Sequence, residues 1–131
     1  MATLFEENQH EEIGHYNIDF GNAPIANKAL FENLISKSLS HMTQKMFEAD
    51  AFRINPQYII RFASVEQSHS RNIIRCKITL NIRNWFQIKA EHKSYQPKQA
   101  FKEVLIDMKY QIEEQKNYIV STFDELMKEA V

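Results

Sequence analysis

The chain has 131 residues, of which 44% are apolar and 25% are charged, and its formal net charge is −1. This length suits a single domain with a sizeable hydrophobic core. Because Cys76 is the only cysteine, an internal disulfide is excluded. No run of residues approaches the roughly 18 apolar positions that a membrane-spanning helix needs. The acidic N-terminus lacks the pattern of a signal peptide, so we expect a cytoplasmic protein that does not enter a membrane.

The near-neutral total conceals a segregated charge distribution. Residues 53–102 contain ten basic and two acidic side chains, which gives this block a charge of +8, whereas the segments before and after it carry −5 and −4. A positive block of this size predicts a nucleic-acid partner. The alternative is a solvated sheet face, because exposed strands often carry Lys and Arg that prevent edge pairing. A merely soluble surface usually mixes both signs, which favours the nucleic-acid interpretation.

The chain begins with an acidic segment and then a short strand. Residues 1–13 carry four glutamates and little periodicity, so we expect a loosely packed N-terminal extension in which Leu4 and Phe5 are the candidates for docking. His15–Phe20 alternates apolar and polar side chains with a period of two, which predicts a half-buried strand.

An amphipathic helix is predicted over Asn27–Glu48, with Asn27 as its N-cap. Its apolar residues recur at three- and four-residue steps, and we expect the following stripe to face the core: Leu30, Leu34, Leu39, Met42 and Met46, flanked by Phe31 and Ile35. The segment from Asp50 to Pro56 is interpreted as a connection.

Three further strands are predicted at Gln57–Glu66, Asn72–Ile82 and Trp85–His92. The middle one alternates most cleanly, with Cys76 on its apolar side and basic residues on the other. Arg83 and Asn84 supply the turn to the last strand. An antiparallel pair with apolar side chains on one face and basic ones on the other follows from this pattern.

The chain ends in a helix that we expect to begin at Pro97. Its apolar residues recur close to a heptad and continue past Ile119, further than a small sheet can cover. Thr122 and Glu125 form a candidate capping box, so a break near Ser121 into a second short helix is the alternative.

The predicted element order is therefore β-α-β-β-β-α. This order defines an α+β two-layer sandwich, in which both helices cover one face of a four-stranded sheet and the last helix is extended. We divide the chain into an acidic N-terminal extension (1–13), an α+β domain (14–117) and a C-terminal helical extension (118–131).

Two segments carry a resemblance to a known family. Residues 16–37 (YNIDFGNAPIANKALFENLISK) and 86–115 (FQIKAEHKSYQPKQAFKEVLIDMKYQIEEQ) resemble the hibernation-promoting factor / ribosome-associated inhibitor family of small bacterial proteins that bind the small ribosomal subunit. The similarity covers roughly residues 15–118. It implies a fold like that of a double-stranded-RNA-binding domain, a place in the decoding channel of idle ribosomes, and a stress-response role in inhibiting translation without catalysis.

The basic block and the resemblance together give the candidate RNA-binding residues. Cations on the strands and loops would neutralise rRNA phosphates, and the resemblance implies the same for Lys37 in the first helix and for Lys98 and Lys102 at the start of the second. The candidates are Lys37, Arg61, Arg71, Arg75, Lys77, Arg83, Lys89, Lys93, Lys98 and Lys102.

The second helix departs from the family's basic pattern, since Asp107, Glu113 and Glu114 lie along it. The alternative function is therefore a protein-interaction or dimerisation module on the same fold that has lost ribosome binding. Apolar residues near the C-terminus either fold back on the domain or form a helix–helix homodimer seam. These candidate docking residues are Tyr118, Ile119, Phe123, Leu126 and Met127.

The sequence gives little indication of an enzyme or of a metal site. Its five histidines and one cysteine show no metal-ligand spacing, and no acid, base and nucleophile lie at a usable spacing. We expect neither a cofactor nor catalysis, and we expect Cys76 to be a buried, inert thiol.

Overall fold

A computed structural model describes residues 13–68 and 71–129 of the chain. The expected N-terminal extension therefore lies outside the described residues, except for Ile13. In chain order the elements are β1 (His15–Asp19), α2 (Lys28–Phe47), a 3-10 turn (Glu48–Asp50), α3 (Ala51–Ile54), β2 (Gln57–Ser68), β3 (Arg71–Ile82), β4 (Phe86–Ser94) and α4 (Pro97–Glu129).

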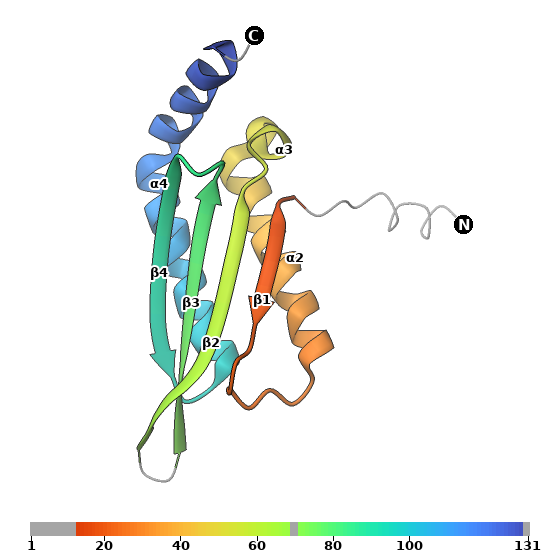
Figure 1. The fold of residues 1–131 in the computed structure, drawn as a ribbon, viewed down its shortest axis with the longest axis vertical. Helices are drawn as coiled ribbons and strands as arrows, with labels where there is room; N and C mark the ends of the chain where they lie inside the picture. The colour runs from red at the N-terminus through yellow and green to blue at the C-terminus, as the bar shows by residue number, and fades with distance from the viewer. Residues whose placement is uncertain (1–12, 69–70, 130–131) are drawn as a thin grey trace, which may run out of the picture.

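The four strands form one sheet in the order β1-β2-β3-β4. β1 pairs with β2 in parallel, and the two remaining pairs are antiparallel. Figure 1 shows α2 and α4 side by side on one face of this sheet, and no described element covers the other face. The predicted β-α-β-β-β-α two-layer sandwich is thus confirmed.

Local chemistry explains where the elements begin and end. The side chain of Asn27 accepts a hydrogen bond of 3.1 Å from the backbone N–H of Leu30, as an N-cap residue does. Pro97 opens α4, where its missing N–H costs no helical hydrogen bond. Arg83 and Asn84 adopt positive φ angles of 46° and 66°, and this reverses the chain between β3 and β4 as the sequence predicted.

The core side of α2 differs from the predicted stripe. Phe31, Ile35 and Leu39 are buried against the sheet, whereas Leu30 and Leu34 are 61% and 43% exposed. Both sets recur at helical spacing, and the set centred on Ile35 faces the sheet in the folded chain. The prediction that Leu30 and Leu34 face the core is wrong.

Alternating residues of the sheet supply the other half of the core. Tyr58 and Ile60 of β2 and Ile78 of β3 are fully buried, and so are Val104 and Met108 of α4 above them. Cys76 is buried on the same side, as predicted. The basic residues between these positions consequently point toward the uncovered face of the sheet.

α4 is one continuous helix of 33 residues, about 50 Å long. In Figure 1 it runs past the end of the sheet and beside α3. Ile119 and Phe123 in this part are fully buried, and an ion pair of 2.7 Å joins Arg53 to Asp124. The alternative of a break near Ser121 is wrong, because the helix is held along this length by the domain itself.

The connection predicted from Asp50 to Pro56 is largely helical, since its first residues form the end of the 3-10 turn and α3. α3 ends at Asn55, whose φ of 44° lies in the left-handed region. No helix in the described ranges is long and apolar enough to cross a membrane.

Candidate nucleic-acid interface

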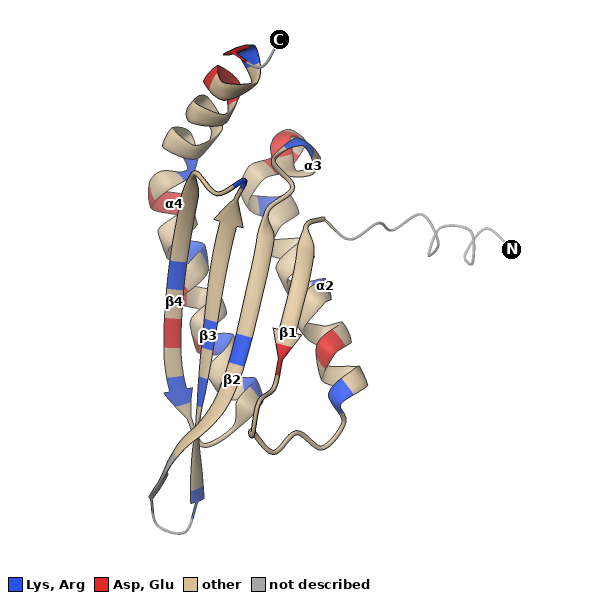
Figure 2. Cartoon of the chain, viewed as in Figure 1, with Lys and Arg blue, Asp and Glu red and all other residues tan. Residues whose placement is uncertain are grey.

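The uncovered face of the sheet gathers half of the predicted RNA-binding residues. Strand alternation places them there between buried core positions, and all are exposed or half-exposed. They are Arg61 on β2, Arg75 and Lys77 on β3, and Lys89 and Lys93 on β4. Figure 2 shows basic positions on each of these three strands.

The strand register sets basic residues directly opposite one another. Arg61 pairs with Lys77 across β2 and β3, and Arg75 pairs with Lys93 across β3 and β4. Side chains at such paired positions have Cβ atoms about 5 Å apart, and like charges there disfavour the sheet. A surface that keeps two such pairs is suited to a polyanion, which would relieve the repulsion.

Acidic groups offset this charge only in part. Asp19 is paired with Arg61 at one side of the sheet, and Glu91 is paired with Lys77 at the other. The carboxylate of Glu91 lies 4.0 Å from Nε of Arg75, and both side chains are more than 40% exposed. Ion pairs this exposed are weak, so the cations remain available to a competing phosphate.

A second group of cations lies on the two long helices, at their first turns and further along them. Neither α2 nor α4 has an acidic residue in its first turn, although the N-terminus of a helix carries a partial positive charge. Lys28 and Lys98 occupy those turns instead, and Lys37 and Lys102 follow, all exposed. These lysines lie on the helical layer, so they form a surface separate from the sheet face.

The two remaining predicted residues each contact an aromatic ring. The guanidinium of Arg71 lies 4.2 Å from the ring centroid of Tyr95, beside the β2–β3 hairpin. Arg83 lies at the turn after β3, with its guanidinium 5.2 Å from the centroid of Phe123. Because the full length of β3 separates Arg71 from Arg83, the two residues lie at opposite ends of the sheet. The contact of Arg83 with Phe123 helps to hold α4 on the domain.

The predicted docking residues at the C-terminus mostly contact their own domain. Ile119 and Phe123 are fully buried, and Met127 is partly buried against the core. Tyr118 is 58% exposed, with its ring centroid 6.0 Å from that of Phe86. Leu126 is half-buried, so burial of Ile119 and Phe123 favours the alternative in which this segment folds back on the domain, while Tyr118 stays exposed.

Two titratable side chains of the interior, Cys76 and Tyr58, are withdrawn from solvent. Burial raises the pKa of the Cys76 thiol to about 12, which keeps it protonated. Burial also raises the pKa of Tyr58, whose hydroxyl oxygen is 2.5 Å from that of Thr43. Within residues 13–68 and 71–129, no group of three or more His, Cys, Asp or Glu side chains is arranged to hold a metal ion.

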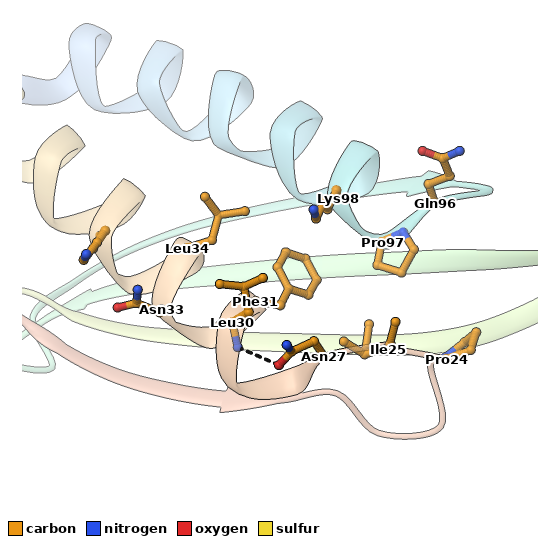
Figure 3. Close-up of a pocket in the computed structure, with 12 residues that line it drawn as sticks. Pro24, Ile25, Asn27, Leu30, Phe31, Asn33, Leu34, Gln96, Pro97 and Lys98 are labelled. Carbon is orange, nitrogen blue, oxygen red and sulfur yellow. Dashed lines mark hydrogen bonds between the residues drawn. The ribbon is translucent and has the colours of Figure 1, made fainter.

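The sequence did not single out Lys28, or a groove between the two helices. The groove lies between the start of α2 and the start of α4 (Figure 3), and Leu30 and Leu34 line it. The signal for Lys28 was its place in the first turn after the N-cap. No comparable signal marked the groove, because it depends on the packing of α2 against α4.

Comparisons with known proteins support the fold. No protein-family model and no curated protein matches the chain. Among solved structures, it is similar to the N-terminal domain of Protein Y from Thermus thermophilus, with a TM-score of 0.57 and 10% identity, over 77% of this chain and 97% of that one. It is also similar to a ribosomal subunit interface protein from Coxiella burnetii, with a TM-score of 0.45 and 13% identity, over 79% and 98% of the two chains. The similarity to the Protein Y domain shows that the chain shares its fold, which is the fold expected from the resemblance of the sequence to the hibernation-factor family.

Proposed function

We propose that this chain is a non-catalytic ribosome-associated factor that binds rRNA of the small subunit and inhibits translation in idle ribosomes. One observation carries the proposal. The uncovered sheet face sets Arg61 opposite Lys77 and Arg75 opposite Lys93 on a domain with the fold of Protein Y. Binding to ribosomes would place the protein in the cytoplasm.

The chemistry of such binding is charge neutralisation and shape. Lys and Arg side chains that contact phosphates release counterions from RNA, and this release supplies affinity without reading sequence. A two-layer domain with a rigid sheet presents its cations at fixed spacings, as recognition of folded RNA by shape requires. A domain bound in the decoding channel would inhibit translation by excluding messenger and transfer RNA.

Sedimentation with ribosomes tests this function directly. Purified protein mixed with small ribosomal subunits at low salt is expected to travel with them through a sucrose gradient. Endogenous protein in lysates of stationary-phase cells is expected in the same fractions. If the protein stays at the top of both gradients, ribosome association is refuted.

A second candidate is docking of a protein partner along α4. Ile106 and Tyr110 lie one helical turn apart on its outer side and are 68% and 65% exposed. Acidic residues such as Glu113 flank them, so a partner would present an apolar and basic surface. Replacing Ile106 and Tyr110 with Ser would abolish this docking and leave ribosome binding intact, whereas the first function predicts the reverse for changes on the sheet face.

A further inference from the structure

An apolar groove separates the start of α2 from the start of α4. It has a volume of about 730 Å³, and Figure 3 shows it between the loop after β1 and the first turns of both helices. Ile25, Leu30, Leu34 and Pro97 make its apolar lining, and Lys37 and Lys98 are its only charged lining residues. An occupant that fits it is therefore apolar where it touches the lining and acidic where it passes the lysines.

We propose that residues 1–12 of the same chain cover this groove, with Leu4 and Phe5 against Leu30 and Leu34 and the neighbouring glutamates beside Lys37 and Lys98.

The place where the described chain begins makes this docking geometrically feasible. Ile13 is 2% exposed, and its backbone N–H donates a hydrogen bond of 2.9 Å to Oγ of Ser40 on α2. Ser40 and Leu34 are six residues apart, which is about 9 Å along a helix and about a third of a turn around it. The eight residues from Phe5 to Glu12 span up to about 26 Å when extended, so Phe5 can reach the groove across the outer side of α2.

Composition matches the segment to the groove. Residues 1–12 contain four glutamates and no lysine or arginine, and the pair Leu4-Phe5 is followed directly by Glu6 and Glu7. Lys37 lies between Ser40 and Leu34 along α2, and Lys98 lines the groove from α4, so favourable charge pairs would form with both. A nucleic-acid strand would use the lysines and leave Leu30 and Leu34 in water. The N-terminal segment would pair with the lysines and also cover Leu30 and Leu34.

This docking has a consequence that rests on the proposed function. Lys37 and Lys98 are candidate RNA-binding residues, and glutamates beside them would compete with phosphates. The segment would then weaken RNA binding at the helical layer and leave the sheet face untouched. Docking of the segment does not depend on RNA, so docking and its effect on RNA binding are tested separately.

Disulfide cross-linking in the full-length chain tests the docking. In one double variant, Thr3→Cys is combined with Asn33→Cys in the groove, and in the control Thr3→Cys is combined with Ile106→Cys on the outer side of α4, so that Leu4, Phe5, Leu30 and Leu34 all remain. Asn33 and Ile106 are both exposed, so neither change disturbs the core. The native Cys76 is fully buried and does not compete for the new thiols.

Under mild oxidation, the groove pair is expected to form an intramolecular disulfide in about tenfold higher yield than the control pair, because docking raises the local concentration of one thiol at the other. Reversing the charge of Glu6 and Glu7 to Lys is expected to reduce that yield. Equal yields from the two pairs, or no disulfide in either, would overturn the proposal. A disulfide that joins two chains on a non-reducing gel would also overturn it and assign the groove to a second copy.

Discussion

Phe123 is the residue that fixes the far part of α4 on the domain. Its side chain is fully buried, and the guanidinium groups of Arg53 and Arg83 each lie 5.2 Å from its ring centroid. Arg53 also pairs with Asp50 and Asp124, and these hydrogen bonds raise its pKa. One aromatic ring therefore joins α3, the β3–β4 turn and α4.

Replacing Phe123 with Ala is expected to lower the free energy of unfolding by about 3–5 kcal/mol, because a large buried ring is lost and a cavity remains. Urea unfolding measures this change. Phe52→Ala is the matched control, since Phe52 is 60% exposed and its removal is expected to change stability by less than about 0.5 kcal/mol. Equal effects of the two substitutions would show that Phe123 is not the anchor of α4.

The buried thiol of Cys76 predicts how stability depends on alkaline pH. Its pKa is raised from 9.0 to about 12 in the folded chain, so between these values the unfolded chain releases a proton that the folded chain keeps. Stability therefore falls as pH rises through this window, by at most about 1.4 kcal/mol per pH unit from this group. The raised pKa of Tyr58 acts in the same direction.

The contribution of Cys76 is isolated by comparison with Cys76→Ala. Chemical unfolding at pH values from 8 to about 11 is expected to give a shallower fall of stability for the variant than for the native chain, because one linked proton is removed. Slopes that agree between the two proteins would mean that the thiol ionises as readily when folded as when unfolded.

At the scale of elements, the continuity of α4 is the feature with the clearest test. Ser121 is exposed in the middle of the part that packs beyond the sheet, and its hydroxyl donates a hydrogen bond of 3.4 Å to the carbonyl oxygen of Tyr118. Proline inside a helix removes a hydrogen bond and clashes with the preceding turn. Ser121→Pro is expected to lower the free energy of unfolding by about 3 kcal/mol.

Ser121→Ala serves as the control, because alanine favours a helix and leaves its backbone intact, and we expect it to be neutral or slightly stabilising. Both variants are compared by urea unfolding and by the helical signal in circular dichroism. If proline is tolerated as well as alanine, the helix is interrupted at this position and a second helix begins there.

The sequence predicted the elements well because each has a strong local cause. Alternation in β3 located its buried face, Asn27 marked the start of α2, and Pro97 marked the start of α4. The choice between two apolar stripes on α2 was not local, because Leu30 and Leu34 recur at the same spacing as Phe31 and Ile35. Only the placement of α2 on the sheet decides between them.

The arrangement of the site was less predictable than its composition. Opposition of Arg61 and Lys77 depends on the strand register, which an irregularity between Ser64 and Glu66 shifts. The contact of Arg83 with Phe123 joins residues 40 positions apart in the sequence, so no local pattern signals it. Candidate cations were identified from charge alone, and the fold then distributed them over the sheet face, the helical layer and the two ends of the sheet.

At the scale of the whole molecule, the basic and acidic parts of the sequence lie on different parts of the fold. Figure 2 shows basic positions on β2, β3 and β4 of the uncovered face, while acidic positions lie in the 3-10 turn before α3 and recur along the far part of α4. A nearly neutral protein therefore presents one surface to a polyanion and another that repels it. In the proposed function, such a distribution would orient the protein on RNA as well as contribute to binding.

The dependence of binding on salt tests this account most directly. Affinity for isolated small ribosomal subunits would be measured over a range of salt concentrations for the native protein, for Arg75→Gln with Lys77→Gln, and for the control Lys109→Gln with Lys128→Gln. The control removes the same charge from exposed positions of α4. Both pairs are exposed or half-exposed, so the fold is expected to persist.

If the sheet face contacts phosphates, log affinity falls linearly with log salt, and losing two contacts reduces the steepness of that line by about 1.4 to 1.8. The account predicts this reduction for the sheet-face variant and an unchanged slope for the α4 control. A flat salt response in the native protein, or the same slope in all three proteins, would contradict the claim that this face binds RNA.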